Sequence, residues 1–350
     1  MQAVTVRPGS AGTLEVTEVP EPGPELGDLL VQGLALGVCG TDREIADGDY
    51  GFAPAGRDLL VLGHESLGRV VEAPDGSGFA AGDLVAGVVR RPDPEPCGAC
   101  ARGQFDMCRN GRYTERGIKE LDGYGSRTWR VESEYAVRLD PALERAGVLM
   151  EPTSVVAKAW DQIEKVGNRA WFEPRRVVVT GAGPIGLLAA MLGVQRGLDV
   201  HVVDLVSDGV KPQLVRDLGA TYSSDPVADV LERVRPDVVV EATGASSVVL
   251  PSLGGTSAYG ITCLTGVSTA GRSTSVDAGA LNRDLVLEND VVIGSVNANL
   301  GHYAAAAAAL AAADGEWLGR LITRTVPLER AAEAFDADED DVKVVIDLTR

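Results

Sequence analysis

Two short segments of this chain contain residues that could carry chemistry. The first, Gly-His-Glu-Ser-Leu-Gly at 63–68, places an imidazole beside a carboxylate, and both groups bind zinc. The second, Gly-Ala-Gly-Pro-Ile-Gly at 181–186, has the glycine spacing of a loop that holds a dinucleotide. A chain with both segments is most simply interpreted as an oxidoreductase that moves a hydride to or from a nicotinamide.

The surroundings of the glycine-rich segment match those of a dinucleotide site. It follows a predicted strand at 176–180 and begins a predicted helix, whose N-terminal N–H groups can hold a phosphate. The first glycine permits the tight turn, the second lets the backbone approach a pyrophosphate, and the third lets the helix pack closely on the sheet. The predicted cofactor-binding residues of this loop are Gly181, Gly183, Pro184, Ile185 and Gly186.

An acidic residue ends the next predicted strand, at 201–204. The Asp204 carboxylate can accept hydrogen bonds from the adenosine ribose and repel a 2′-phosphate, which predicts a preference for NAD. The three residues that follow include no arginine, so NADP would need a more distant donor such as Lys211 or Arg216. The alternative interpretation is that Asp204 only caps the next helix.

Cysteine, histidine and carboxylate side chains suitable for a catalytic zinc stand at four places. Cys39 lies in Gly-Val-Cys-Gly-Thr-Asp at 37–42, His64 and Glu65 are adjacent, and Glu151 follows Met150. A catalytic zinc keeps one position open for water or substrate. An isolated His-Glu pair is more often an exposed polar pair, although the chain has only three histidines.

Taken in order, G-x-C-G-T-D, G-H-E-x-x-G and G-A-G-P-I-G resemble the zinc-dependent medium-chain dehydrogenase/reductase superfamily over the whole chain. Four further segments resemble its glucose (aldose) 1-dehydrogenase branch; they lie at 88–92, 114–118, 151–152 and 296–298. The resemblance implies a catalytic zinc held by Cys39, His64 and Glu151, with Glu65 as a ligand or an exchanging carboxylate. It also implies oxidation of an aldose at C1 to the lactone.

The same resemblance assigns roles to further residues. Thr41 would start a proton relay, although its hydroxyl could instead bond its own turn. Glu115, Glu151 and Asn297 would contact the sugar, and Asn297 also the cofactor; Glu115 and Asn297 could also be ordinary solvated residues. The remaining implied cofactor-binding residues are Thr243, Gly244 and Gly266. A polyol, other-sugar or amino-alcohol dehydrogenase, or a non-catalytic dinucleotide-binding sensor, are the alternative functions.

Three further cysteines form a second candidate metal site. The spacing of Cys97, Cys100 and Cys108 resembles the superfamily's four-cysteine structural zinc lobe, but Pro94 stands where the first cysteine would be. Three thiolates do not complete a tetrahedral site, so Asp93 or Glu95 must do so, or the lobe binds no metal. A fifth cysteine, in a predicted apolar strand at 260–264, is interpreted as a small buried apolar residue.

The predicted elements place these residues in an α/β fold. Short apolar runs and turn residues over the first 150 or so positions indicate a mostly β, barrel-like domain, which the resemblance identifies as GroES-like. Strands at 176–180, 201–204, 238–241, 260–264 and 291–294 alternate with helices, which indicates a doubly wound parallel sheet of six strands, a Rossmann domain. The predicted boundaries are 1–155 for the first part of the catalytic domain, 156–297 for the dinucleotide-binding domain and 298–350 for the return to the catalytic domain.

Composition limits the partners. The chain has 350 residues and a formal net charge of -19, which weighs against nucleic acid or an anionic membrane as a partner. No apolar run approaches the about 18 residues of a membrane span, and an odd number of cysteines suits a reduced compartment, so a cytoplasmic location is expected. The expected partners are a small sugar and, by the resemblance, further copies of the chain in a homodimer or homotetramer.

Overall fold

The computed structural model describes residues 1–268, 274–336 and 338–350. It divides into two compact units, one formed by Met1–Ser154 with Asn297–Arg350 and the other by Val155–Val296. Within the described residues, no helix combines the length and the apolar character needed to cross a membrane.

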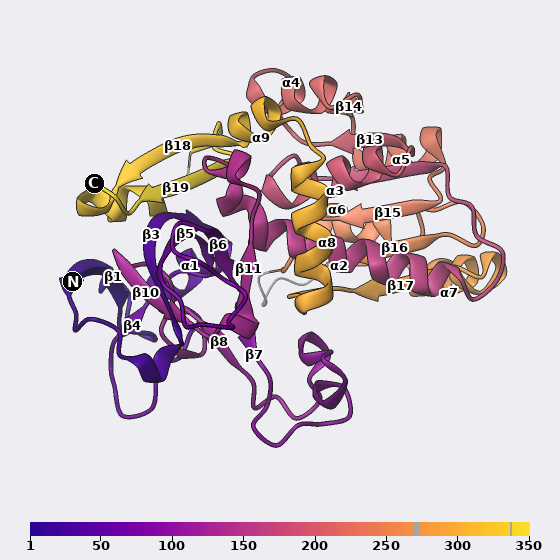
Figure 1. Cartoon of the computed structure of the whole chain (residues 1–350). Helices are drawn as coiled ribbons and strands as arrows, with labels where there is room; N and C mark the ends of the chain where they lie inside the picture. Colours follow the sequence, from indigo (N-terminus) through magenta and orange to yellow (C-terminus); the bar gives the residue numbers. More distant parts are fainter. Residues whose placement is uncertain (269–273, 337) are drawn as a thin grey trace. The chain divides into compact units, whose positions relative to one another are not determined.

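The first unit is mostly β (Figure 1). Its strands are β1 (Gln2–Val6), β2 (Glu15–Glu18), β3 (Leu29–Val38), β4 (Leu60–Val61), β5 (Glu65–Glu72), β6 (Leu84–Gly87), β7 (Arg90–Arg91), β8 (Thr114–Arg116), β9 (Glu120–Leu121), β10 (Thr128–Val131), β11 (Ala136–Arg138), β18 (Ile322–Pro327) and β19 (Lys343–Asp347). Its α-helices are α1 (Gly40–Ala46), the first turn of α2 (Met150–Gly167), α8 (Leu300–Ala311) and α9 (Gly315–Leu321). Its 3-10 helices are η1 (Pro24–Leu26), η2 (Cys100–Arg102), η3 (Phe105–Met107), η4 (Ser133–Tyr135), η5 (Pro141–Leu143), η6 (Gly147–Leu149) and η7 (Leu328–Phe335).

The largest sheet of this unit brings distant segments of the chain together. Its strand order is β11-β6-β5-β3-β19-β18, and β10 also pairs with β3. The long strand β3 pairs with β5 on one side, where Gly37 is opposite Glu65, and with β19 on the other, where Val38 is opposite Val344. The end of β3 therefore lies between the start of β5 and the start of β19, the C-terminal strand.

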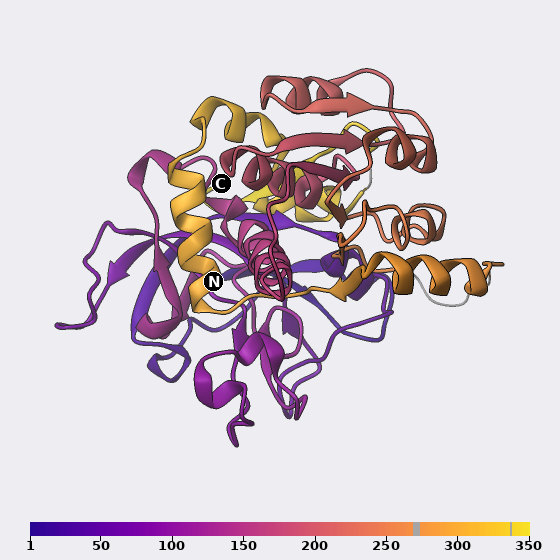
Figure 2. The same ribbon diagram turned by 90° about the vertical axis from the view of Figure 1, so that its right-hand side faces the viewer.

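The second unit is a six-stranded parallel sheet with helices between its strands (Figure 1). The strands are β12 (Arg176–Thr180), β13 (Asp199–Val203), β14 (Thr221–Ser223), β15 (Val238–Glu241), β16 (Ile261–Leu264) and β17 (Val291–Gly294), in the order β14-β13-β12-β15-β16-β17. Its helices are the rest of α2 and α3 (Pro184–Gln195), α4 (Val210–Asp217), α5 (Val227–Val234), α6 (Ser246–Ser252) and α7 (Ala278–Glu288). Figure 2 shows the same sheet in a view turned by 90°.

Burial explains why these valine-rich runs are strands. Val177, Val178, Val179, Val239 and Val240 are all fully buried, as expected for parallel strands covered on both faces. The predicted α/β class, with a doubly wound parallel sheet of six strands and a mostly β domain, is confirmed. The sequence pattern places five of the six strands to within two residues. The sixth, β14, is a short edge strand of exposed and half-buried residues, and its pattern gives no such signal.

Candidate active site

Strands β3 and β5 bring three candidate zinc ligands together. Cys39 directly follows β3 and precedes α1, while His64 and Glu65 stand at the start of β5. The Cys39 Sγ lies 3.0 Å from His64 Nε2, and the ligand atoms of Cys39, His64 and Glu65 all lie within 4.8 Å of one another. His64 and Glu65 are buried and Cys39 is half-buried, so the cluster combines a sulfur, a nitrogen and an oxygen donor in a largely buried site. This donor set fits zinc.

Asp42, which the sequence analysis did not single out, orients two members of this cluster. Its Oδ2 accepts a hydrogen bond from the Cys39 backbone N–H at 3.0 Å, and its Oδ1 lies 3.3 Å from His64 Nδ1. Burial alone would lower the pKa of His64, but the negative charges of Asp42 and Cys39 outweigh burial and hold this pKa well above its ordinary value. Because Asp42 engages Nδ1, the Nε2 atom is left to face the cluster. The sequence signal that was available for Asp42 is its position three residues after Cys39.

A buried lysine from the C-terminal strand pairs with Glu65. Lys343 Nζ lies 2.7 and 2.6 Å from the two Glu65 carboxylate oxygens and donates to the Val38 carbonyl at 3.3 Å. The two side chains are only 1% and 2% exposed. Burial would lower the pKa of Lys343, but the charge of Glu65 outweighs it and raises this pKa. The sequence analysis missed Lys343, whose only signal was a single charge in an apolar strand.

Glu151 and Thr41 lie in the elements that adjoin this cluster. Glu151 stands in the first turn of α2 and is not part of the group of mutually close ligand atoms found among the described residues. Burial is the main cause that raises the pKa of Glu151 to about 7; Glu65 raises it further, and the charge of His64 lowers it. Thr41 is a half-buried residue of α1. The structure thus brings three of the four predicted ligands together and leaves Glu151 beside them.

Glu115 and Asn297 meet in a buried network. Asn297 Nδ2 donates to Glu115 Oε1 at 2.7 Å, and its own Oδ1 accepts from the Ala298 N–H at 2.8 Å. Arg90, opposite Glu115 in the β7–β8 ladder, donates to the same oxygen from Nε at 3.1 Å and from Nη2 at 2.9 Å. Neither Glu115 nor Asn297 is the solvated residue that the alternative interpretation proposed, because their exposures are 5% and 9%.

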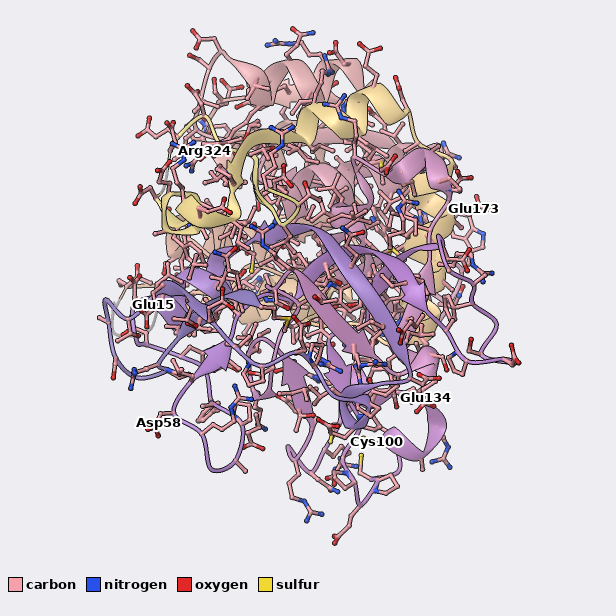
Figure 3. The ribbon with its side chains drawn as sticks, turned by 60° about the vertical axis from the view of Figure 1, so that its left-hand side comes forward. Glu15, Asp58, Cys100, Glu134, Glu173 and Arg324 are labelled. Atoms are coloured by element: carbon pink, nitrogen blue, oxygen red, sulfur yellow. The ribbon has the colours of Figure 1, made fainter. Side chains whose placement is uncertain are left out.

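The cysteine loop, residues 93–112 of the first unit, contains the second candidate site. The sulfurs of Cys97, Cys100 and Cys108 lie within 4.8 Å of one another, and this group contains no carboxylate among the described residues. Figure 3 labels Cys100 in the lower part of the view, with yellow sulfur atoms close to the label. The Arg109 N–H donates to Cys97 Sγ at 3.4 Å and is the main cause that lowers the pKa of Cys97 to about 6. A thiol with this pKa is largely a thiolate at neutral pH, the form that binds metal.

Asp93 and Glu95 differ in their surroundings within this loop. Asp93 is buried; its Oδ1 accepts from the Glu95 N–H at 2.8 Å, and its buried Oδ2 accepts no hydrogen bond among the described residues. Glu95 is 81% exposed and pairs with Arg112 at 2.8 Å. Asp93 Oδ2 lies 3.5 Å from Arg112 Nε, so this carboxylate is paired as well as buried. Its burial favours Asp93 over the exposed Glu95 as a further ligand.

In the second unit, the glycine-rich loop has the form that a dinucleotide needs. Gly181 has a φ of +92°, and a Cβ at Gly186 would lie 1.8 Å from the Gly181 carbonyl oxygen, so both positions require glycine. A Cβ at Gly183 would meet nothing within 4 Å, which leaves open space beside the backbone where a pyrophosphate can approach. Pro184 and Ile185 begin α3. Proline fits this first position because the N–H that it lacks would have no hydrogen-bond partner within the helix.

Two acidic side chains hold the loops of this unit. Asp204 Oδ2 accepts from the Ala182 N–H at 2.5 Å, and Asp204 Oδ1 accepts from the Leu205 N–H at 2.6 Å. Asp204 therefore ties the end of β13 to the glycine-rich loop. Glu241, at the end of β15, accepts from the N–H groups of Thr243 at 2.8 Å and Gly244 at 3.1 Å.

Gly266 follows β16 and lies beside the loop of Thr243 and Gly244, at the carboxyl ends of the strands. A Cβ at Gly266 would lie 2.2 Å from the Gly244 nitrogen, so only glycine fits there. The predicted residues Thr243, Gly244 and Gly266 are therefore neighbours: the buried Glu241 carboxylate holds Thr243 and Gly244, and the Glu241 backbone carbonyl accepts from the Gly266 N–H at 3.0 Å. Sequence reasoning missed Glu241, for which the only signal was an acid at the end of an apolar strand.

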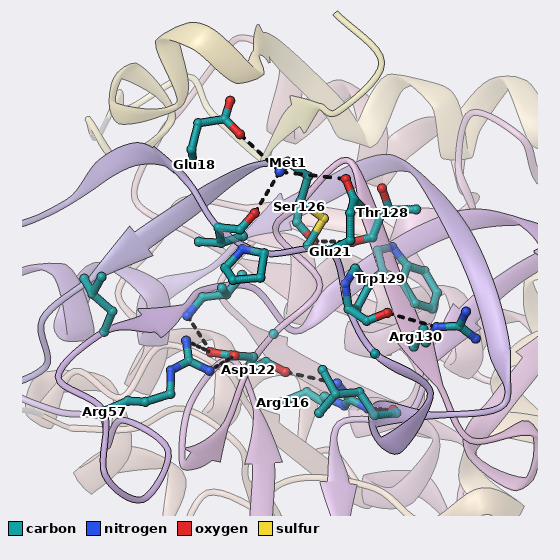
Figure 4. Close-up of a pocket in the computed structure, with 18 of the residues that line it drawn as sticks. Met1, Glu18, Glu21, Arg57, Arg116, Asp122, Ser126, Thr128, Trp129 and Arg130 are labelled. Carbon is teal, nitrogen blue, oxygen red and sulfur yellow. Dashed lines mark hydrogen bonds and ion pairs between the residues drawn. The ribbon is translucent and has the colours of Figure 1, made fainter.

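A cavity of about 660 Å³ elsewhere in the first unit contains none of the predicted site residues (Figure 4). Some of its charged groups pair with one another: Arg57 binds Asp122, and the Met1 amine lies 3.1 Å from Glu18. These two pairs are therefore already compensated within the protein.

Comparisons with known proteins agree with this geometry. A family model described as the glucose dehydrogenase C-terminus matches residues 144–348, and one described as the alcohol dehydrogenase GroES-like domain matches residues 25–141. The chain is 40% identical to glucose 1-dehydrogenase of Methanocella arvoryzae and 40% identical to that of Thermoproteus tenax, each over 99% of both chains. A solved structure of Haloferax mediterranei glucose dehydrogenase in complex with NADP, Zn and gluconolactone is 34% identical, with a TM-score of 0.91 over 99% of both chains.

Proposed function

We propose that this chain, which belongs to the glucose 1-dehydrogenase family of the zinc-dependent medium-chain dehydrogenase/reductase superfamily, oxidises D-glucose or a related aldose at C1. The product would be the lactone. The observation that carries the proposal is the cluster of half-buried Cys39 with buried His64 and Glu65, a zinc-binding donor set in a chain that also has the dinucleotide loop. The Haloferax mediterranei enzyme, solved in complex with NADP, Zn and gluconolactone, supports the same reaction here.

The chain's own residues would hold the metal as follows. Cys39, His64 and Glu151 are the proposed ligands, and Glu65 is a ligand or an exchanging carboxylate. A zinc ion bound by this set would act as a Lewis acid that lowers the pKa of the sugar hydroxyl, and a bound nicotinamide would accept the hydride. Lys343 binds both carboxylate oxygens of Glu65 and holds it in place, which opposes its permanent attachment to a metal.

Three polar residues would handle the proton and the sugar. Thr41 would receive the hydroxyl proton and pass it towards solvent. Glu115 and Asn297 would bind sugar hydroxyl groups, and a sugar lacking the matching hydroxyl would leave a buried polar group unpaired at a cost of about 1–3 kcal/mol. Burial of the Glu115 and Asn297 side chains supports this selectivity.

For the cofactor we propose NAD in preference to NADP. The Asp204 carboxylate stands at the end of β13 and is held in place by two backbone N–H groups, so its negative charge is fixed near the predicted ribose position. A fixed carboxylate favours ribose hydroxyls over a 2′-phosphate. Thr243, Gly244 and Gly266, which lie together, would contact the rest of the dinucleotide.

We further propose that the cysteine loop binds a second, structural zinc through Cys97, Cys100 and Cys108. Asp93, which is buried in the same loop with Oδ2 3.5 Å from Arg112 Nε, would be the fourth ligand. A homodimer or homotetramer stays a prediction from the sequence resemblance.

A substrate panel tests the proposed reaction. Initial rates would be measured with NAD and with NADP against D-glucose, D-galactose, D-xylose, sorbitol and L-threonine. The proposal predicts oxidation of the aldoses with NAD favoured, and lactone as the product. Oxidation of sorbitol or L-threonine without oxidation of any aldose would retain the dehydrogenase chemistry but contradict the aldose assignment.

A further inference from the structure

We propose that Arg90 is a positioning residue: it fixes Glu115 for the sugar and couples that carboxylate to the cysteine loop. The inference rests on the proposed function, because it takes Glu115 to be the acceptor of a sugar hydroxyl. It goes beyond that function by making sugar affinity depend on a residue that stands behind the binding carboxylate.

Each of the three guanidinium nitrogens of Arg90 donates a hydrogen bond within the protein. Nε and Nη2 donate to Glu115 Oε1 at 3.1 and 2.9 Å, and Nη1 donates to the carbonyl oxygen of Asp106 at 3.0 Å. The guanidinium carbon lies 3.7 Å from the centre of the Tyr113 ring, which packs over its flat face. Arg90 is 6% exposed, so these contacts lie in an environment where each is stronger than it would be in water.

The consequence for Glu115 is that its two oxygens have different roles. Oε1 accepts three hydrogen bonds, two from Arg90 and one from Asn297 Nδ2 at 2.7 Å. No hydrogen bond to Oε2 is present among the described residues. The carboxylate is therefore fixed by one oxygen and can accept from a ligand with the other, which makes it a directional acceptor suited to one hydroxyl group.

The other end of Arg90 reaches the cysteine loop. Asp106, whose carbonyl accepts from Arg90, lies in η3 between Cys100 and Cys108. The Asp106 side chain is also anchored, because its Oδ1 accepts from Asn299 Nδ2 at 2.8 Å. The conformation of the cysteine loop therefore fixes the carbonyl that holds Arg90, and Arg90 in turn fixes Glu115.

The neighbouring arginine provides a matched comparison. Arg91, also buried, binds Glu132 at 2.7 Å and the Val88 carbonyl at 2.9 Å, and packs over the Tyr135 ring. It is similar to Arg90 in burial, partner type and ring contact, but no hydrogen bond or ion pair of Arg91 with Glu115 is present among the described residues. A purely structural role for a buried arginine would make the two positions equivalent in their effect on sugar binding.

The test compares Arg90→Met, Arg90→Lys and Arg91→Met in the full-length zinc-loaded enzyme, with D-glucose as the probe. We expect Arg90→Met to raise the KM for D-glucose at least tenfold while the KM for NAD changes less than twofold. Arg90→Lys, which keeps the positive charge but loses the paired Nε and Nη2 donors to Glu115, should give an intermediate KM for D-glucose. Arg91→Met should lower the melting temperature and leave both KM values within twofold. A fall in kcat alone, with the KM for D-glucose unchanged in both Arg90 variants, would overturn the inference.

A double-variant cycle shows whether Arg90 acts through Glu115. If it does, the KM for D-glucose of Arg90→Met/Glu115→Gln should equal that of Glu115→Gln within twofold; if the two increases multiply, the inference is wrong. Should Arg90→Met not fold, the Arg90→Lys and Arg90→Lys/Glu115→Gln proteins give the same decision. A wild-type enzyme that oxidises no aldose contradicts the proposed function, whereas an active wild type with unaffected Arg90 variants contradicts only this inference.

Discussion

The two groups of candidate metal ligands in the first unit differ in their donors and in their origin along the chain. Cys39, His64 and Glu65 supply sulfur, nitrogen and oxygen from the ends of two paired strands. The cysteine loop supplies three sulfurs from one short segment. Mixed donors with an open position are typical of zinc that binds substrate, and closed thiolate sets are typical of zinc that holds a loop.

The charges around the two groups differ as well. Beside the first group, Asp42 and Lys343 are buried and each pairs with a member of the cluster. Beside the second, the Arg112–Glu95 pair is 58% and 81% exposed. The fold therefore isolates Asp42 and Lys343 from water, where they act strongly on the ligands of the first group. Beside the second group it buries Asp93 but leaves the Arg112–Glu95 pair largely screened by solvent.

The largest expected effect is at the first group. Replacement of Cys39 by serine should lower kcat/KM for D-glucose by about a thousandfold, because a Lewis acid contributes several kcal/mol to the reaction barrier. Metal analysis should show loss of one zinc per chain with the second retained. The control is Cys263→Ala, which removes a buried thiol that belongs to neither group and should leave kcat/KM within about threefold. Full activity of Cys39→Ser would remove this cluster from the mechanism.

The second prediction concerns the buried ion pair beside the first group. Lys343→Met should lower the free energy of unfolding by about 3–5 kcal/mol, because it leaves the Glu65 charge buried without its partner. Urea denaturation measures this change. The double variant Lys343→Met/Glu65→Gln should recover most of the lost stability, since neither charge then remains. A double variant no more stable than the single one would show that the pair is not the cause.

The third prediction concerns the cysteine loop. Cys100→Ser should lower the free energy of unfolding by about 1–2 kcal/mol and abolish binding of the second zinc. If the loop holds Arg90 in place and Arg90 in turn holds Glu115, the KM for D-glucose should rise severalfold while the KM for NAD stays constant. Steady-state kinetics with metal analysis measures both changes. An unchanged KM for D-glucose in protein that lacks the second zinc would separate the loop from the sugar site.

The smallest effect is expected at the exposed edge of the loop. Glu95→Gln should change the free energy of unfolding by less than about 0.5 kcal/mol, because its ion pair with Arg112 lies in solvent. Zinc content should remain at the wild-type value, whereas Asp93→Asn should weaken binding of the second zinc. Loss of the second zinc in Glu95→Gln, with full retention in Asp93→Asn, would show that Glu95 and not Asp93 is the fourth ligand.

Local pattern explains which parts of the fold could be predicted from the sequence. The valine-rich runs of β12 and β15 and the glycine spacing at 181–186 each contain their own signal, because burial and backbone conformation restrict the residue types allowed there. Cys39 and His64 could be picked out as candidate ligands from the sequence because each is a metal-binding side chain in a short glycine-rich segment.

The positioning residues were not predicted, because they act across pairings that the sequence does not display. Lys343 reaches Glu65 only because β19 and β5 both pair with β3, and Arg90 reaches Glu115 only through the β7–β8 register. Lys343 begins a strand that is otherwise apolar up to Asp347, and Arg90 is one of two adjacent arginines after an apolar run. Such a charge becomes informative only when its partner is known. Glu241 differs, because it holds Thr243 and Gly244 only two and three residues further on, but an acid at the end of an apolar strand does not by itself predict those contacts.

The most direct test of the central claim is removal and return of zinc in the wild-type enzyme, with D-glucose oxidation by NAD and zinc content measured on the same samples. The account predicts that the rate falls as a chelator removes zinc and recovers when zinc is added back. An undiminished rate of D-glucose oxidation in protein shown to contain no zinc would contradict the account.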